Sequence, residues 1–250
     1  MKVGVFDSGI GGLTVVKSLL EHKLFEEIIY YGDTARVPYG VKDKNTIVRY
    51  SLEAFEFFKN FDIDIFIIAC NTVSAYAINE LKEVANIPII GVIEPGVLAC
   101  EKKIKDKDAN ILVLGTKATI TSKKYETNLN NLGYKNLTSI PTGLFVPIVE
   151  EGIFEGEILD STMRHYFKGL KDVDAVILGC THFPLIAQKI SSYLNDCDTI
   201  HSGEAIVGYL KDEHKYDKSF KNTKVTFFAS ENPESLKNTA KDWLGDLLND

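Results

Sequence analysis

Residues 64–75 read Asp-Ile-Phe-Ile-Ile-Ala-Cys-Asn-Thr-Val-Ser-Ala. The apolar run at 65–69 has the length of a strand that is buried on both faces of a parallel sheet. Cys70 ends that run, helix-capping residue types follow it, and residues 75–84 are predicted to form a helix. Cys70 therefore lies at a strand-to-helix turn, on the edge of an α/β sheet where ligands bind. The N-terminus of the helix is expected to lower the pKa of this thiol and to favour the thiolate.

The same construction recurs at residues 172–184, which read Asp-Val-Asp-Ala-Val-Ile-Leu-Gly-Cys-Thr-His-Phe-Pro. An acidic pair, an apolar run, Cys180 and capping residues follow in the same order, and Pro184 suits the first position of a helix. Each cysteine taken alone could be a small buried hydrophobe, which is common for this residue. Their place after the run, beside polar capping residues, favours function. Two equivalent cysteines predict one site with a thiol on each side.

Strands and helices are predicted to alternate along the chain, which indicates parallel sheets. The pattern restarts near Asn110. A strand at 111–114 is followed by Gly115-Thr116, just as a strand at 3–6 is followed by Asp7-Ser8. The two halves are therefore interpreted as structural repeats. We predict an α/β fold of two similar lobes with mainly parallel sheets, related by a pseudo-twofold axis, with the active site between them.

The remaining elements follow from the spacing of apolar residues and from turn formers. Helices are expected at 13–21, 46–59, 158–170 and 233–248, and strands at 28–31, 88–92, 137–140 and 225–228. Residues 94–96, Glu-Pro-Gly, are interpreted as a break and 144–152 as a loop with an acidic end. The long, turn-rich loop at 33–40 is predicted to be functional. The pattern alone leaves open on which lobe the tail packs.

The composition is that of a soluble globular protein, with 45% hydrophobic and 25% charged residues. The net charge of -7 argues against nucleic acid as a direct partner, because neutralising phosphates requires a basic face. No apolar run approaches the length that spans a membrane, and the N-terminus does not resemble a signal peptide. Arginine occurs only at Arg36, Arg49 and Arg164. Hydroxyls and helix N-termini are therefore expected to hold an anionic ligand.

The four cysteines show no Cys-x-x-Cys spacing, which predicts reduced thiols and a cytoplasmic protein. Cys70 and Cys180 lack the closely spaced cysteines and histidines of a zinc site, and His182 alone does not change this, so no metal is expected. Cys100, on a predicted helix, and Cys197, between aspartates, are interpreted as structural.

The turn at 7–12, Asp-Ser-Gly-Ile-Gly-Gly, could belong to a dinucleotide-binding loop. That fingerprint requires a third glycine at position 14, which is Thr14, and Asp7 would repel a pyrophosphate. Asp33 stands near the position of a ribose-binding acid and keeps this alternative open. The favoured interpretation gives Asp7 an ionisable role, while Ser8 and backbone N–H groups hold a small ligand.

Two thiols that face each other across a small substrate suit proton transfer at carbon on both faces. One must be a thiolate to take the proton and the other a thiol to deliver one, and the pair titrates as a unit. Ser8, Asn71, Thr72, Thr116 and Thr181 offer donors for carboxylates. We therefore predict stereoinversion of a small anionic acid without a cofactor. By the pattern alone, His182 could be a surface histidine or an N-cap neighbour, and in a cleft it could shift the proton affinity of a nearby amine or thiol. Glu150 is more readily interpreted as a solvated acid, and Tyr39-Gly40 could be a simple turn.

Four segments together resemble bacterial glutamate racemase, a family of the aspartate/glutamate racemase superfamily. They are Phe-Asp-Ser-Gly-Ile-Gly-Gly-Leu-Thr at 6–14, Gly-Asp-Thr-Ala-Arg-Val-Pro-Tyr-Gly at 32–40, Ala-Cys-Asn-Thr at 69–72 and Gly-Cys-Thr-His-Phe-Pro-Leu at 179–185. The resemblance covers about the first 210 residues. It implies cofactor-independent interconversion of L- and D-glutamate, with D-glutamate supplied to peptidoglycan synthesis.

The resemblance also implies roles for individual residues. Cys70 would act on D-glutamate and Cys180 on L-glutamate, assisted by three residues, Asp7, Glu150 and His182. Glu151 follows Glu150 directly, and both remain candidates for the acidic position. The residues implied to bind substrate are Asp7, Ser8, Tyr39, Gly40, Asn71, Thr72, Thr116, Thr119, Thr121, Thr181 and His182.

The family fold implies two lobes, residues 1–93 plus 211–250 and residues 94–210, with the tail returned to the first lobe. The family is usually homodimeric. The nearest rival is an aspartate racemase or another member of the same superfamily, which would share both cysteines and differ in the size of the cleft. A two-lobed solute-binding protein and a redox thiol enzyme are rivals of other classes.

Overall fold

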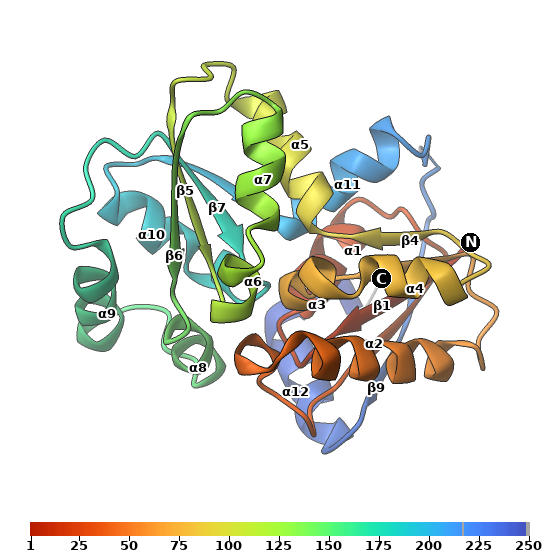
Figure 1. Cartoon of the computed structure of the whole chain (residues 1–250). Helices are drawn as coiled ribbons and strands as arrows, with labels where there is room; N and C mark the ends of the chain where they lie inside the picture. Colours follow the sequence, from red (N-terminus) through yellow and green to blue (C-terminus); the bar gives the residue numbers. More distant parts are fainter. Residues whose placement is uncertain (217, 249–250) are drawn as a thin grey trace.

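Two sheets of parallel strands form the core of the chain (Figure 1). The computed structural model describes residues 1–216 and 218–248. The first sheet has the order β4-β3-β1-β2-β9 and the second the order β6-β5-β7-β8. The strands are β1 (Lys2–Asp7), β2 (Glu27–Gly32), β3 (Ile65–Ile68), β4 (Ile89–Gly91), β5 (Asn110–Gly115), β6 (Asn136–Pro141), β7 (Ala175–Gly179), β8 (Asp198–His201) and β9 (Lys224–Ala229). The predicted α/β class with two parallel sheets is confirmed.

Helices cover both sheets (Figure 1). They are α1 (Leu13–Glu21), α2 (Lys44–Phe58), α3 (Asn71–Tyr76), α4 (Ile78–Val84), α5 (Ile93–Lys103), α6 (Lys117–Thr121), α7 (Lys124–Asn131), α8 (Phe145–Glu150), α9 (Glu157–Phe167), α10 (Ala187–Tyr193), α11 (Ser202–Asp212) and α12 (Pro233–Leu244), with short 3₁₀ turns η1 (Tyr39–Val41), η2 (Phe183–Ile186) and η3 (Gly245–Leu248). None of the helices in the described residues has the length and apolar character that a membrane crossing requires.

The two sheets repeat one another down to single hydrogen bonds. Strands β1 to β4 occupy the same relative places in the first sheet as β5 to β8 in the second. The backbone N–H of Lys2 donates to Asp64 Oδ2 at 2.7 Å, and that of Asn110 donates to Asp174 Oδ2, also at 2.7 Å. An aspartate before the third strand thus binds the start of the first strand in each half. The repeat inferred from the acidic pairs therefore has a physical basis.

Alternate residues of the central strands enter opposite faces of each sheet. Val5 and Ile67 join one apolar cluster, and Phe6 and Ile68 join the cluster on the other face. Full burial of such a side chain contributes about 1.5–3 kcal/mol. Burial on both faces is why these strands are continuous apolar runs rather than alternating ones.

The C-terminal tail returns to the first sheet. Strand β9 pairs in parallel with β2, and helix α12 buries Leu236, Ala240 and Leu244 in the same cluster as α1. The residue ranges of the two lobes stay a prediction. Residues 217, 249 and 250 of the expected first lobe lie outside the described residues.

Three local predictions were wrong. The expected break at 94–96 lies inside α5, and the expected loop at 144–152 contains α8. Pro95 and Pro147 each stand in the first turn of their helix, where no intrahelical N–H bond is lost. The helix expected at 75–84 begins earlier, at Asn71, and is divided at Ala77.

Candidate active site

Both Cys70 and Cys180 line one cavity of about 660 Å³. Cys70 follows β3 and is the N-cap of α3, and Cys180 follows β7 in the second sheet. The lining residues are Ser8, Gly9, Val37, Pro38, Tyr39, Gly40, Val41, Cys70, Asn71, Thr72, Thr116, Lys117, Pro141, Gly143, Val146, Pro147, Glu150, Gly179, Cys180, Thr181 and His182. The carboxyl ends of two strands from two different sheets thus supply the two thiols.

The Cys70 thiol is buried, and its side-chain hydrogen-bond partner is a neutral hydroxyl. Its Sγ is 3.3 Å from Ser8 Oγ, and only 5% of the residue is exposed. Burial, together with the negative charge of Asp7, raises the pKa of Cys70 to about 12, against the weaker lowering effect of Ser8. The expectation that the helix N-terminus favours the thiolate was therefore wrong for Cys70, because desolvation outweighs the helix dipole. In the free protein Cys70 is a thiol.

The Cys180 thiol has a different neighbour. Its Sγ is 3.7 Å from Nδ1 of His182, and the other ring nitrogen, Nε2, is 2.9 Å from Oε1 of Glu150. Burial acts to lower the pKa of His182, but hydrogen bonds with Cys180 and Glu150 raise it to about 10. A protonated imidazole in this position donates at both nitrogens and places a positive charge beside the Cys180 sulfur.

Asp7 lies behind the cavity wall rather than on it. Its Oδ2 accepts the backbone N–H of Gly9 at 2.9 Å, and its Oδ1 accepts the Thr181 hydroxyl at 3.3 Å. Burial raises the pKa of Asp7 against the lowering effect of His182 and these donors. The carboxylate joins the Ser8 turn of the first half to the Cys180 turn of the second.

Three threonine hydroxyls meet between the two halves. Thr72 Oγ1 is 2.9 Å from Thr116 Oγ1 and 3.3 Å from Thr119 Oγ1, and the last two are 3.0 Å apart. Thr116 also caps α6 by accepting the backbone N–H of Thr119. Thr72 and Thr116 line the cavity, whereas Thr119 lies behind them. The three hydroxyls form a triangle, which is called the threonine cluster below.

The loop predicted to be functional supplies Tyr39 and Gly40. The Tyr39 ring is buried and its hydroxyl donates to Asp33, while Asp33 also pairs with Arg36. Burial and the Asp33 contact raise the pKa of Tyr39 well above its usual value. A Cβ on Gly40 would lie 2.5 Å from Cβ of Thr116, so only glycine lets this loop approach the threonine cluster.

The glycines of the turn at 7–12 allow charged and polar side chains to pack closely against its backbone. A Cβ on Gly11 would lie 2.3 Å from Thr181 Oγ1 and 2.6 Å from His182 Nδ1, and one on Gly12 would lie 2.6 Å from Cβ of Asp7. These contacts explain why positions 11 and 12 require glycine. The dinucleotide interpretation is therefore not needed to account for the turn.

The structure brings most, but not all, of the predicted site residues to the cavity. Asp7 and Thr119 are one contact behind it, and Thr121 is exposed at the end of α6. Glu150, rather than Glu151, lines the cavity and reaches His182. Sequence reasoning missed Lys117 and the apolar residues of α8, Val146 and Pro147. The only signal for Lys117 was its place directly after Thr116. Val146 and Pro147 were missed because α8 had been interpreted as a loop.

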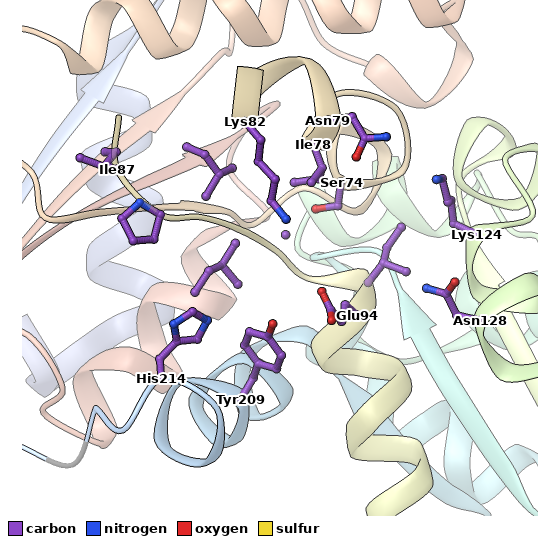
Figure 2. A pocket seen from close by; sticks show the side chains of 15 residues that line it. Ser74, Ile78, Asn79, Lys82, Ile87, Glu94, Lys124, Asn128, Tyr209 and His214 are labelled. Atoms are coloured by element: carbon purple, nitrogen blue, oxygen red, sulfur yellow. The ribbon is translucent and has the colours of Figure 1, made fainter. Parts of the chain in front are cut away.

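A second cavity, of about 500 Å³, contains neither thiol (Figure 2). Ser74, Lys82, Glu94, Tyr209 and His214 are among the residues that line it, and the Lys82 side chain extends into it. Its lining contains neither of the two repeated strand-to-helix turns that bring Cys70 and Cys180 to the first cavity. We therefore assign the chemistry to the cavity that holds Cys70 and Cys180. Within the described part of the chain, no group of three or more His, Cys, Asp or Glu side chains is arranged to hold a metal ion.

Comparison with known proteins gives a consistent family. The family model of Asp/Glu/Hydantoin racemase matches residues 14–210. Glutamate racemase of a Nitratiruptor species is 62% identical to this chain over 249 residues, which is 99% of this chain and 98% of the relative. The crystal structure of glutamate racemase from Campylobacter jejuni subsp. jejuni superposes with a TM-score of 0.96 at 56% identity, covering 98% of both chains.

More distant structures share the architecture. Glutamate racemase from Francisella tularensis subsp. tularensis, in complex with D-glutamate, gives a TM-score of 0.85 at 36% identity and covers 97% of this chain and 93% of its own. Both the family model and the close relatives extend over more than half of the sequence. The chain therefore belongs to the Asp/Glu/Hydantoin racemase family, within which it groups with the glutamate racemases, and it is an isomerase.

Proposed function

We propose that this chain interconverts L- and D-glutamate by moving the α-proton between Cys70 and Cys180, without a cofactor. One observation carries the proposal: the two thiols come from corresponding turns of two repeated halves and line the same cavity. Two proton-transfer groups on opposite sides of one carbon are what inversion at that carbon requires. The relatives named above are glutamate racemases, and one of them was solved with D-glutamate bound, which supports this choice of substrate.

In the L-to-D direction, Cys180 takes the proton. The imidazolium of His182 stabilises a thiolate at Cys180 by its charge, and Glu150 holds the proton on the ring. The thiolate removes the α-proton of L-glutamate, and the electron pair of that C–H bond stays on the substrate as a carbanion. Cys70, a thiol in the free protein, donates its proton to the opposite face. The product is D-glutamate, with Cys180 now a thiol and Cys70 a thiolate.

The reverse reaction begins from that second form, and Cys70 then removes the proton from D-glutamate. Turnover in the reverse direction, or passage of a proton from Cys180 to Cys70 through water, restores the first form. Ser8, 3.3 Å from Cys70, is the hydrogen-bond partner that stabilises the transient thiolate. The two sulfurs thus have different neighbours, the hydroxyl of Ser8 at Cys70 and the imidazole of His182 at Cys180.

Hydroxyls and backbone N–H groups hold the substrate carboxylates in this scheme. Ser8, Tyr39, Gly40, Thr72, Thr116 and Thr181 are proposed to contact glutamate directly, because they line the cavity. Asp7 and Thr119 are proposed to act one contact away: Asp7 fixes Thr181, and Thr119 fixes the threonine cluster. The N-terminus of α3 follows Cys70, and the positive end of this helix is proposed to favour an anionic ligand. A direct role for Thr121 stays a prediction, since its side chain is exposed.

The biological setting follows from the same resemblance. The D-glutamate formed would supply peptidoglycan synthesis in the cytoplasm, and the active species would be a homodimer. Complementation of a D-glutamate-requiring bacterial strain tests the first point. Light scattering tests the second, since one chain has a mass of 27.9 kDa.

The decisive experiment is incubation of the purified protein with L-glutamate in heavy water, with no added cofactor. A two-base racemase must place deuterium at the α-carbon while the optical rotation decays to zero. A solute-binding protein or a redox thiol enzyme would do neither, and that result would refute the proposal. A parallel incubation with L-aspartate separates the substrates: faster racemisation of aspartate than of glutamate would make this chain an aspartate racemase.

A further inference from the structure

Tyr125 connects the surroundings of the two thiols although it lies outside the cavity. It belongs to α7, next to the second sheet, and only 3% of the residue is exposed. Its hydroxyl donates to Oδ1 of Asn71 at 2.7 Å. Asn71 is the residue after Cys70 and the first residue of α3. A buried hydrogen bond thus links the second half of the chain to the residue beside Cys70.

The other end of the Asn71 amide is also occupied. Its Nδ2 donates to Ser202 Oγ at 3.2 Å, and Ser202 is the first residue of α11. Asn71 and Ser202 are 2% and 3% exposed. The Asn71 side chain, which the resemblance assigns to substrate binding, is therefore engaged on both sides by the protein itself. Its backbone N–H, at the start of α3, and the second hydrogen of its Nδ2 are the donors that these two contacts do not use.

The ring of Tyr125 lies against the neighbour of the second thiol. A Cβ on Gly179, the residue before Cys180, would be 3.2 Å from Cε2 of Tyr125. A Cβ on Gly96 in α5 would be 3.2 Å from the Tyr125 hydroxyl oxygen. Because neither glycine has a side chain, the Tyr125 ring can occupy the space beside both. A single side chain therefore touches the residue that follows Cys70 and the residue that precedes Cys180.

We propose that Tyr125 is a positioning residue that sets the distance between the two thiols. The inference rests on the proposed function, in which both sulfurs must reach the same carbon. Proton transfer depends steeply on distance, and a displacement of about 1 Å can cost about 100-fold in rate. Without the hydroxyl, Asn71 loses one of its two side-chain partners and keeps Ser202, so one buried hydrogen bond fewer holds α3 and Cys70 to the second half.

The test is Tyr125→Phe, with Tyr134→Phe as matched control. Tyr134 is also buried, and its hydroxyl donates to the Ile104 carbonyl, away from both thiols. We expect Tyr125→Phe to lower kcat per folded molecule by about 10- to 100-fold, with a smaller change in KM. Tyr134→Phe should lower the melting temperature by a similar amount and leave kcat per folded molecule close to that of the wild type.

A second readout measures the thiol spacing itself. Bis-alkylating reagents of graded length are added to each protein, and mass spectrometry measures the yield of a covalent bridge between Cys70 and Cys180. The length that gives the highest yield should change in Tyr125→Phe and stay unchanged in Tyr134→Phe. If Tyr125→Phe matches its control in rate, or keeps the bridging profile of the wild type, Tyr125 does not set the spacing.

Gly96→Ala tests the same contact should Tyr125→Phe fail to fold. The added methyl group must displace the Tyr125 ring by a few tenths of an ångström, while alanine is the better helix former. We expect kcat to fall by about 3- to 10-fold with no loss of melting temperature. Gly208→Ala in α11, where a Cβ meets nothing within 4 Å, is its control. A wild type that does not racemise glutamate would refute the proposed function, whereas an unaltered Gly96→Ala would refute only this inference.

Discussion

Nε2 of His182 lies 2.9 Å from Oε1 of Glu150. The contact joins the end of α8 to the turn that follows β7, and it engages the ring nitrogen that does not face Cys180. Among the described residues no equivalent pair stands beside Cys70, whose side-chain partner is the neutral hydroxyl of Ser8. The repeated fold therefore holds two chemically different thiols, one next to a cation and one next to a hydroxyl.

Glu150→Gln should lower the pKa of His182 from about 10, because the carboxylate that stabilises the imidazolium is removed. Since the ring would then lose its proton at a lower pH, the alkaline limb of the kcat/KM profile is expected to move to lower pH. At pH 8 the activity should fall by about 10-fold. NMR titration of the His182 ring measures the pKa directly.

Glu151→Gln is the matched control for that experiment. Glu151 is the C-cap of α8 and is exposed, and it does not line the cavity. Its variant should keep the pH profile of the wild type. If Glu151→Gln moves the profile and Glu150→Gln does not, the assignment of the acidic position is reversed.

Alkylation should distinguish the two thiols in the free protein. The thiolate is the reactive form, and the pKa of Cys70 is raised to about 12, whereas Cys180 lies beside the His182 imidazolium. Iodoacetamide at pH 7 is therefore expected to modify Cys180 at least about 10 times faster than Cys70. Peptide mass spectrometry over time measures both rates. Equal rates would show that the different neighbours of the two sulfurs, Ser8 and His182, do not make their reactivities differ.

The thiol turns could be predicted from the sequence because their signals are local. A buried strand, a cysteine and a helix cap are adjacent in the chain, and so both Cys70 and Cys180 were found. Helix α8 was missed because Phe145 to Glu150 contains two valines and a proline, which are poor helix formers. Packing overrides this preference: Phe145 contacts Phe183 edge-on at 5.6 Å between ring centroids and is fully buried.

The electrostatics and the long-range contacts could not be predicted in the same way. The direction of the Cys70 pKa depends on how deeply the thiol is buried, which the local pattern does not give. Glu150 acquires its importance only because α8 packs beside the His182 turn. Tyr125 meets Asn71 across 54 positions of sequence, and no spacing rule relates them. The local pattern indicated which residues take part in the proposed reaction. Tertiary packing determines their protonation.

Gly11→Ala tests the close approach of the two halves. Its methyl group would have to occupy space 2.3 Å from Thr181 Oγ1 and 2.6 Å from His182 Nδ1, so both residues must move. We expect kcat/KM to fall by about 100-fold, because the imidazole leaves its position beside Cys180. Gly208→Ala, with open space at its Cβ, should retain full activity. Racemisation by Gly11→Ala at the rate of the wild type would show that the His182 position is unimportant.

Removal of each catalytic sulfur tests the two-base scheme itself. Cys70→Ala and Cys180→Ala should each reduce racemisation by about 10²- to 10⁴-fold, the usual contribution of a positioned acid or base. Cys100→Ala is the control, since Cys100 is fully buried in α5 and does not line the cavity. Its loss of one sulfur should lower stability by about 1 kcal/mol and leave the rate unchanged. Polarimetry with L- and D-glutamate in turn measures both directions. A scheme with a single base predicts that one of the two active-site variants retains activity, and that outcome would exclude proton transfer from opposite faces.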